Sequence, residues 1–239
     1  MKNKKSGPRK GSLETGSKRW RELILDGAER MGAPLDGRAA GLFAIHAREL
    51  SMWNKKINLT AISDPLETAV KHFIDSIAAA DLFPEGARLL DMGSGGGFPG
   101  LALKAARPDL SVTLLDASMK KTHFLSHVIR QTGLGDVRAA HGRAEDLAGD
   151  DSYKGRFDAV VCRAFSSLPD IWEKGAPFLS KNGRLTAWKG KNGESEAKEF
   201  LSGLSDMGAG GDEADVRIKK YRLPFLDLER ALVLILKGR

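Results

Sequence analysis

The sequence of 239 residues contains a single cysteine, Cys162. One cysteine excludes an internal disulfide and a zinc site built from several cysteines, and it fits a reducing compartment. Long hydrophobic runs are also missing: the longest, ALVLIL, has the length of a strand and falls far short of the roughly 18 apolar residues that cross a bilayer. The basic N-terminus lacks the apolar stretch of a signal peptide. We therefore expect a cytoplasmic protein without a membrane segment.

Positive charge, in contrast, is in excess, with 38 Lys and Arg against 31 Asp and Glu and a formal net charge of +7. Several basic residues lie in the Gly/Ser-rich segment 1–18, which we predict to be a disordered tail, and others lie in KGKNGESEAK. Clustered Lys and Arg attract phosphates whatever the sequence of the nucleic acid. The charge is compatible with a polyanionic partner and equally with a tail that only improves solubility.

The segment from 19 to 84 is predicted to be a helical extension. Apolar residues at helical spacing indicate helices over residues 19–31 and 38–53. Asp64 followed by Pro65 is typical of a helix N-cap and first turn, so a third helix should run from there to about residue 79.

Short apolar runs alternate with helical stretches over residues 85–239. Strands are predicted at 88–92, 112–116, 136–142, 157–163 and 183–190, and helices at 101–106, 119–132, 171–179 and 194–204. This alternation predicts an α/β fold with a doubly wound, mostly parallel sheet and helices on both faces. The last two runs, 215–226 and 230–238, have no helix between them, so they should form a hairpin at one edge that supplies the single antiparallel strand of a seven-stranded sheet.

The stretch LLDMGSGGGFPG, residues 89–100, leads the first of these strands into a glycine-rich turn. In doubly wound sheets, ligands bind outside the carboxyl ends of the strands, and Gly93 and Gly95 would let a ligand approach the main chain. We expect free N–H groups at the start of the next helix to point outward. A dinucleotide-binding turn has the pattern G-x-G-x-x-G, but Phe98 stands where the third glycine belongs. Asp91, just before the turn, would repel a pyrophosphate and suits a cationic, phosphate-free ligand such as S-adenosylmethionine.

Residues that follow the next two strands extend this assignment. Asp116 ends the second strand, 23 positions after Gly93, where its carboxylate can accept both hydroxyls of a ribose; the alternative is that it only caps the next helix. Ala144 and Glu145 follow the third strand and could frame an adenine, with Ala144 acting through its backbone. Together with the glycine-rich turn after the first strand, these residues after the second and third strands favour S-adenosylmethionine as the cofactor.

Six motifs carry a resemblance to a known family: WNKKINLTAI, KHFIDSI, LLDMGSGGGFPGLALKAARPD, VTLLDASMKKTHFL, GRAEDL and VVCRAFSSL. Over about residues 50–239 the sequence resembles the RsmG family, also called glucose-inhibited division protein B, of bacterial methyltransferases. The resemblance implies a class I, Rossmann-like methyltransferase fold. It also implies methyl transfer from S-adenosylmethionine to N7 of one guanosine in 16S ribosomal RNA, so that this RNA or the small ribosomal subunit is the expected partner.

Carried over position by position, the resemblance places the cofactor contacts at Gly93, Phe98, Ala144, Glu145 and Arg163, with Asp116 at the family's acidic position. Guanine N7 has an in-plane lone pair and no proton, so its methylation needs no general base. The expected catalytic contribution is therefore the positioning of the base. Arg163 is the predicted positioning residue, as a donor to guanine O6 or to a phosphate. Lys189, after the fifth strand, either grips an RNA phosphate or is a solvated surface lysine.

Three further features have competing interpretations. Cys162 would be the nucleophile of a cytosine-C5 methyltransferase, but its neighbours in VVCR indicate a buried core residue. His123 and His127 stand four residues apart on a helix without a third ligand, so no metal site is predicted. Trp53 is assigned to the core in preference to base stacking, and His72 belongs to the helices that could cover the site.

Two other functions stay open: a small-molecule methyltransferase with the same cofactor site, and a non-catalytic RNA-binding or assembly factor. A nicotinamide dehydrogenase is the weakest alternative, because of Phe98 and Asp91. The target RNA is expected to be looped or single-stranded, since the base must leave its stack to enter a pocket. The sequence does not fix the oligomeric state, and a monomer is the simplest expectation.

Overall fold

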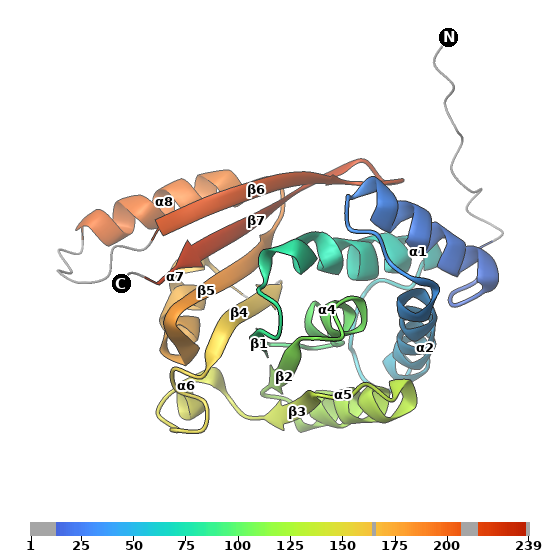
Figure 1. Cartoon of the computed structure of the whole chain (residues 1–239), viewed down its shortest axis with the longest axis horizontal. Coiled ribbons are helices and arrows are strands. Elements are labelled where there is room, and N and C mark those ends of the chain that lie inside the picture. Colours follow the sequence, from blue (N-terminus) through green and yellow to red (C-terminus); the bar gives the residue numbers. More distant parts are fainter. Residues whose placement is uncertain (1–12, 164–165, 207–214, 238–239) are drawn as a thin grey trace, which may run out of the picture.

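The computed structural model describes residues 13–163, 166–206 and 215–237, which form a seven-stranded sheet with helices on both faces (Figure 1). The strands are β1 Arg88–Met92, β2 Ser111–Asp116, β3 Val137–His141, β4 Phe157–Arg163, β5 Leu179–Lys189, β6 Asp215–Leu223 and β7 Leu228–Leu236. They lie in the order β3-β2-β1-β4-β5-β7-β6. β1 to β5 are parallel, while β7 runs antiparallel to both β5 and β6. The predicted doubly wound sheet with one antiparallel strand is confirmed, and β7 is inserted between β5 and the edge strand β6.

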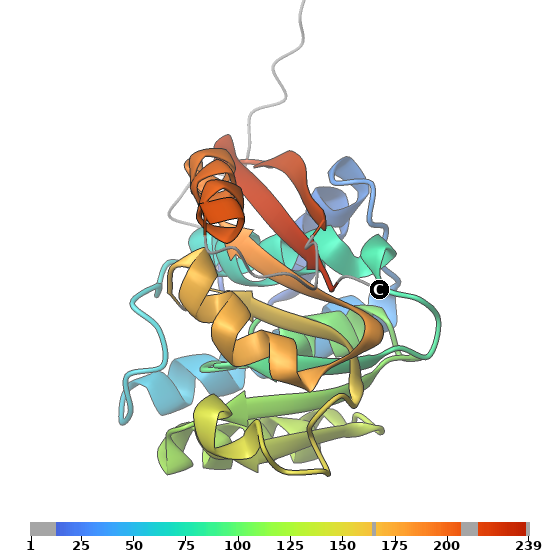
Figure 2. The ribbon, with the colours of Figure 1, turned by 90° about the vertical axis from the view of Figure 1, so that its left-hand side faces the viewer.

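The central strands are continuous apolar runs because helices cover both of their faces. Successive residues of a strand point to opposite faces, so Leu89 and Val161 join one buried cluster while Leu90 and Cys162 join the other. The second cluster is closed by α6 Ala144–Leu147, α7 Leu168–Gly175, the 3₁₀ turn η3 Ala176–Phe178 and α8 Gly193–Asp206. Figure 2 shows α6, α7 and α8 in front of the sheet.

On the opposite face, α4 Gly100–Ala106 and α5 Met119–Thr132 pack together with the N-terminal helices α1 Lys18–Arg30 and α2 Gly37–Asn54. An aromatic group anchors this extension: the Phe73 ring lies 5.4 Å edge-on from Trp20 and 4.9 Å from Phe43, between ring centroids. Each such buried ring stabilises the fold by roughly 1.5–3 kcal/mol. Because these rings share one cluster with Leu89 of the sheet, the extension has no separate core.

The described structure begins inside the segment that was predicted to be a tail. Leu13 packs against the main hydrophobic cluster, and α1 begins at Lys18 with the Ser17 hydroxyl accepting from the N–H of Trp20. Residues 1–12 of that predicted tail lie outside the described residues.

The third predicted helix begins as expected but changes type along its length. Asp64 is the N-cap, its carboxylate accepts from the N–H of Glu67, and Pro65 opens the first turn. The helix then runs as α3 Pro65–Glu67, the π-helical segment η1 Thr68–Ile74 and the 3₁₀ segment η2 Ile77–Leu82. Apolar spacing does not reveal a π turn, which is frequently found at functional sites. Here η1 lies against the carboxyl end of β4 and forms part of the candidate site.

Two elements begin three or more residues before their predicted starts, because local patterns do not reveal these boundaries. β5 begins at Leu179, four residues before the predicted start, through a polar segment that pairs irregularly with β4. α7 begins at Leu168, directly after the N-cap Ser167 and three residues before the predicted start. In the part of the chain that the structure describes, no helix is long and apolar enough to span a membrane.

Candidate active site

The glycine-rich turn follows β1 and closes against the end of β2. The N–H of Gly93 donates to the carbonyl of Leu115 at 2.9 Å, and the N–H of Gly95 donates to Asp116 Oδ2 at 2.9 Å. Gly93, Gly95 and Gly97 have φ of 76°, 55° and 88°, the left-handed region that favours glycine. The turn therefore requires these glycines for its backbone shape, and the N–H groups of Gly93, Gly95 and Gly97 donate to acceptors within the protein.

The start of α4 is closed in the same way. The N–H of Gly100 donates to Asp91 Oδ2 at 2.9 Å, and the N–H of Leu101 donates to the Gly97 carbonyl at 2.9 Å. The expectation of free, outward N–H groups here is wrong, because a buried carboxylate takes the first of them. A Cβ added to Gly100 would lie 2.5 Å from Leu114 Cδ2 and 2.6 Å from Asp91 Oδ2. Gly100 thus permits the close helix–strand packing, a role that the sequence analysis missed.

Asp91 lies fully buried beneath the turn. Its Oδ1 accepts no hydrogen bond from the described residues, and its carbonyl accepts from the hydroxyl of Ser94. Burial raises the pKa of Asp91 to about 7, against the opposing effects of its hydrogen bonds and of the Arg163 charge. In this geometry Asp91 holds the start of α4 in place.

Asp116 lies at the end of β2 with both carboxylate oxygens already accepting one hydrogen bond. Oδ2 accepts from Gly95, and Oδ1 accepts from the N–H of Ser118 at 2.8 Å. The second of these contacts matches the capping interpretation of Asp116. Each oxygen keeps a further lone pair, so the carboxylate can still accept hydroxyl groups.

Ala144 and Glu145 open α6 at the end of β3, on the same edge of the sheet as Asp116. Ala144 is buried, while Glu145 is half exposed and its carboxylate lies 3.0 Å from the ammonium of Lys174 on α7. Gly93, Gly95, Asp116 and this pair are therefore brought to the carboxyl ends of three adjacent strands.

The Phe98 ring is packed inside the protein between two histidines. His46 of α2 and His72 of η1 stack on its two faces, each with centroids 4.6 Å apart. His46 Nε2 donates to the carbonyl of Gly96 at 2.7 Å, so the N-terminal extension holds the glycine turn directly. Burial lowers the pKa of His46 to about 4 and that of His72 to about 3, so both rings are neutral near pH 7. Any contact of Phe98 with a cofactor must come from its ring edge or main chain.

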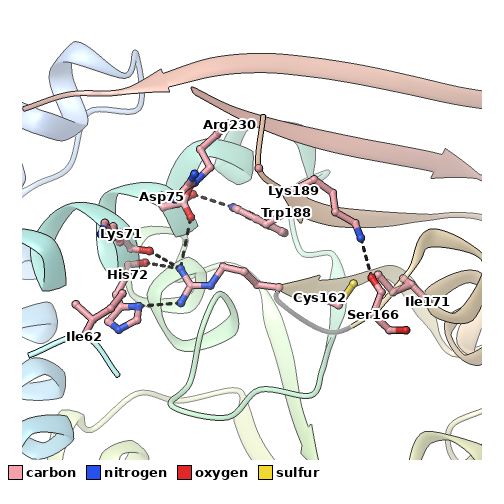
Figure 3. A pocket seen from close by; sticks show the side chains of 12 residues that line it. Ile62, Lys71, His72, Asp75, Cys162, Ser166, Ile171, Trp188, Lys189 and Arg230 are labelled. Atoms are coloured by element: carbon pink, nitrogen blue, oxygen red, sulfur yellow. Dashed lines mark hydrogen bonds and ion pairs between the residues drawn. The ribbon is translucent and has the colours of Figure 1, made fainter. Parts of the chain in front are cut away.

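A cavity of about 540 Å³ lies at the ends of β4 and β5 (Figure 3). Its lining combines apolar and cationic side chains from six segments: Ile62, Lys71, His72, Asp75, Cys162, Arg163, Ser166, Ile171, Trp188, Lys189, Gly190 and Arg230. Among the cofactor-site residues predicted from sequence, only Arg163 reaches this cavity within the described part of the chain. The site therefore has two adjoining parts that meet at this arginine.

The Arg163 guanidinium is mostly buried and is held by η1. Its Nη1 donates to the Lys71 carbonyl at 2.7 Å, and its Nη2 donates to His72 Nδ1 at 3.1 Å. It also lies 5.0 Å from the centroid of the Phe98 ring. Because the guanidinium can only donate, His72 Nδ1 is the acceptor, and the other ring nitrogen faces the Thr60 hydroxyl at 2.9 Å. Arg163 is therefore a buried group in a defined orientation rather than a surface arginine.

Lys189 also lines the cavity, but its ammonium is already engaged. Nζ donates to the Ser166 carbonyl at 2.7 Å and lies 2.7 Å from a carboxylate oxygen of Glu196. Cys162 is buried and its pKa is raised to about 12, first by burial and then by the charge of Asp91. The thiol therefore stays protonated, as the core interpretation requires.

The surroundings of His123, His127 and Trp53 bear on the remaining alternatives. His127 lies 2.7 Å from a carboxylate oxygen of Glu49, His123 is exposed, and the described residues contain no cluster of three metal-binding side chains. Trp53 packs 5.6 Å from Phe124, between ring centroids, against the main cluster. Its assignment to the core is confirmed.

Several cavity residues were missed by the sequence analysis. Asp75, Trp188 and Arg230 come from three distant segments, and nothing in the local pattern joins them. The one available signal was the spacing of His72 and Asp75 in KHFIDSI, which places an imidazole and a carboxylate on one face of a helix.

The strand order, the glycine turn after β1 and the acid that ends β2 define a class I S-adenosylmethionine-dependent methyltransferase fold. Solved structures agree on this fold: TYW2 of M. jannaschii in complex with AdoMet has a TM-score of 0.54 at 16% identity, covering 77% of this chain and 80% of that one. A SAM-dependent methyltransferase from Aquifex aeolicus has a TM-score of 0.53 at 16% identity, covering 72% of this chain and 93% of that one.

A family model described as rRNA small subunit methyltransferase G matches residues 41–206. Proteins named ribosomal RNA small subunit methyltransferase G are 42% identical in Geotalea uraniireducens, over 91% of this chain and 96% of the relative, and 38% identical in Geobacter metallireducens, over 90% and 95%. The chain belongs to the rRNA small subunit methyltransferase G family, and the sequence resemblance is confirmed.

Proposed function

We propose that the protein transfers a methyl group from S-adenosylmethionine to N7 of a guanosine in 16S ribosomal RNA of the small subunit. One observation carries the proposal beyond family membership: the cofactor edge of β1 to β3 adjoins a cationic, partly apolar cavity, and Arg163 belongs to both. Such a cavity suits a base together with its phosphate.

The chemistry of the turn fits S-adenosylmethionine and does not fit a dinucleotide. A pyrophosphate needs free N–H groups, whereas those of Gly95 and Gly100 donate to Asp116 and Asp91. Two carboxylates at this edge favour a cofactor that is cationic and carries no phosphate. Asp116 would hold the ribose through its free lone pairs, and the start of α6 at Ala144 would lie against the adenine. When bound, the cofactor supplies an electrophilic methyl group on its sulfonium.

The residues of the chain then have to orient the base, because N7 already presents a lone pair and no proton needs to be removed. Arg163, held by η1, would donate to guanine O6 or to a phosphate, and Trp188 and Ile62 would exclude water from the apolar side of the cavity. Alignment of two reacting groups lowers the barrier by roughly 7–11 kcal/mol in ideal intramolecular cases. Positioning alone is thus a sufficient source of catalysis.

Positive charge around the site supports RNA as the substrate. Basic residues follow the ends of successive parallel strands: Lys120 after β2, Arg143 after β3, Arg163 at the end of β4, and Lys191 after β5, with all but Arg163 exposed. They surround one edge of the sheet and would attract the phosphates of a looped RNA. Since ribosomal RNA is the substrate in this proposal, we place the protein in the cytoplasm. A monomer stays our prediction.

The test uses small subunits isolated from cells that lack this protein, incubated with the purified chain and labelled S-adenosylmethionine. We expect mass spectrometry of the digested RNA to find one new 7-methylguanosine. A matched RNA transcript in which 7-deazaguanosine replaces guanosine should accept no label, because C–H replaces N7 in that base. Label in the 7-deaza transcript would show that another atom is methylated.

A metabolite extract incubated in parallel addresses the small-molecule alternative. Label in small molecules alone would overturn the proposal. Calorimetry with S-adenosylmethionine addresses the non-catalytic alternative, since an assembly factor without activity need not bind the cofactor.

A further inference from the structure

Asp75 is a buried carboxylate where η1 meets side chains of four strands, and the mechanism above does not use it. It follows η1, is 4% exposed, and accepts a hydrogen bond from the Tyr221 hydroxyl of β6 at 2.6 Å. Its carbonyl accepts from Trp188 Nε1 of β5 at 2.8 Å. Arg163 Nη1 lies 3.6 Å from Oδ2, and Arg230 Nε of β7 lies 4.0 Å from Oδ1 (Figure 3).

The basic side chains around the cavity differ in the carboxylates with which they form ion pairs. Among its described lining residues Asp75 is the one carboxylate, and the four basic side chains of the lining are Lys71, Arg163, Lys189 and Arg230. The two lysines have carboxylates of their own, in Glu67 at 3.0 Å and Glu196 at 2.7 Å. Within the described part of the chain, the two arginines form ion pairs with Asp75 alone.

The two guanidinium groups repel each other, and only 14% of the Arg163 side chain and 25% of the Arg230 side chain are exposed, so water screens their charges less than at the open surface. A carboxylate between them offsets that repulsion. Burial raises the pKa of Asp75, while both arginines and the Tyr221 hydrogen bond oppose the rise. An unpaired buried charge is strongly destabilising, so the carboxylate and the arginines depend on one another.

We propose that Asp75 is a positioning residue that holds Arg163 and Arg230 together at the cavity wall, so that both guanidinium groups engage one nucleotide of the RNA. The proposal rests on the proposed function and deepens it, because it assigns the grip on the target nucleotide to an arginine pair with a shared counter-charge. The Tyr221 hydroxyl of the β6/β7 hairpin fixes the Asp75 carboxylate, although Tyr221 does not line the cavity itself. The hairpin thus contributes to the site through both Tyr221 and Arg230.

The main variant is Asp75→Asn, which keeps the shape and can still accept from Tyr221 but removes the charge. We expect the single-turnover rate of methyl transfer to small subunits to fall about tenfold or more, with S-adenosylmethionine affinity unchanged within about twofold. Asp81→Asn is the matched control. Asp81 pairs with Lys219 of β6 at the surface, at 2.9 Å, so its loss should change the rate by less than about twofold.

A double-variant comparison separates positioning from simple destabilisation. Arg230→Gln should slow the parent, because it removes one of the two guanidinium groups. In the Asp75→Asn background the pair is already lost, so the same change should slow methyl transfer much less. Losses that multiply would overturn the proposal. If Asp75→Asn does not fold, Tyr221→Phe decides: a fall of about two- to fivefold is expected, and an unchanged rate would contradict the inference.

A measurement without RNA keeps this inference distinct from the proposed function. In ¹⁵N NMR spectra of the parent, the guanidinium signals of Arg163, assigned by their loss in Arg163→Lys, should be resolved and slow to exchange. They should broaden in Asp75→Asn and persist in Asp81→Asn. Unchanged Arg163 signals in folded Asp75→Asn would refute the positioning role even if the RNA assay failed for every variant.

Discussion

Replacing Gly100 by alanine tests whether the close contact between α4 and the sheet shapes the cofactor turn. The new Cβ would lie 2.5 Å from Leu114 Cδ2, 2.6 Å from Asp91 Oδ2 and 2.8 Å from Asp91 Cβ. Both neighbours belong to central strands and are buried, so they cannot move aside as a surface side chain would. The helix has to shift, and its shift lengthens the hydrogen bond from Gly100 to Asp91.

Two costs add up in this variant. Overpacking of a core costs about 1–3 kcal/mol, and weakening a hydrogen bond to a charged group costs about 1.5–3 kcal/mol. We expect the free energy of unfolding to fall by about 3 kcal/mol, which for a chain of this size lowers the melting temperature by about 6–12 °C. Because the turn moves with α4, the affinity for S-adenosylmethionine should fall about tenfold, or 1.4 kcal/mol.

Calorimetric melting and titration with S-adenosylmethionine measure both effects. The control is Gly41→Ala in the middle of α2, where a Cβ would meet no atom within 4 Å. That change should stabilise the protein by about 0.5–1 kcal/mol, since alanine is the better helix former. A Gly100→Ala protein that melts and binds like the parent would refute the argument that this contact sets the turn.

Three further outcomes are expected. Asp116→Asn turns an amide N–H₂ toward the N–H of Gly95 or Ser118, so titration should show S-adenosylmethionine affinity about 10- to 100-fold lower, and an unchanged affinity would exclude a ribose contact. The pKa of His72 is about 3 in the folded protein, below its ordinary 6.5. As the pH falls below 6.5, His72 is therefore protonated in the unfolded chain but not in the folded one, and the folded state loses stability. Between about pH 7 and pH 5 the parent should lose about 2 kcal/mol more unfolding free energy than His72→Gln, and equal losses would contradict the assignment. Since the pKa of Cys162 is raised to about 12, iodoacetamide should leave methyl transfer intact and Cys162→Ala should stay active; inactivation would reopen the thiolate mechanism.

Local patterns predicted the elements whose causes are local. β1, β4 and α5 have the predicted bounds, because apolar runs define the two strands and Gly133, at φ 64°, ends the helix. The π segment within Thr68–Ile74 could not be predicted, because its shape is coupled to the Arg163 side chain that binds its carbonyls. The differences between predicted and observed elements therefore arise where contacts with distant parts of the chain determine the local structure.

The residues of the candidate site also separate into those that local sequence patterns reveal and those that only long-range contacts bring together. Gly93, Asp116 and Arg163 were found from sequence because each ends or follows a strand, and parallel strands bring their carboxyl ends to one edge. Asp75 and Tyr221 stand 146 positions apart, and only the completed sheet, with β7 inserted beside β5, brings them together. A long-range pair of this kind leaves no periodic signal in the sequence.

The N-terminal extension is the element whose importance the sequence understated. It was predicted as a possible cover, yet His46 donates to the Gly96 carbonyl, His72 accepts from Arg163, and both stack on Phe98. The helices of residues 19–84 therefore shape the turn that would hold the cofactor and orient the arginine that would hold the base. Because the same helices share one core with the sheet, a substitution that loosens them should reduce cofactor binding and methyl transfer together.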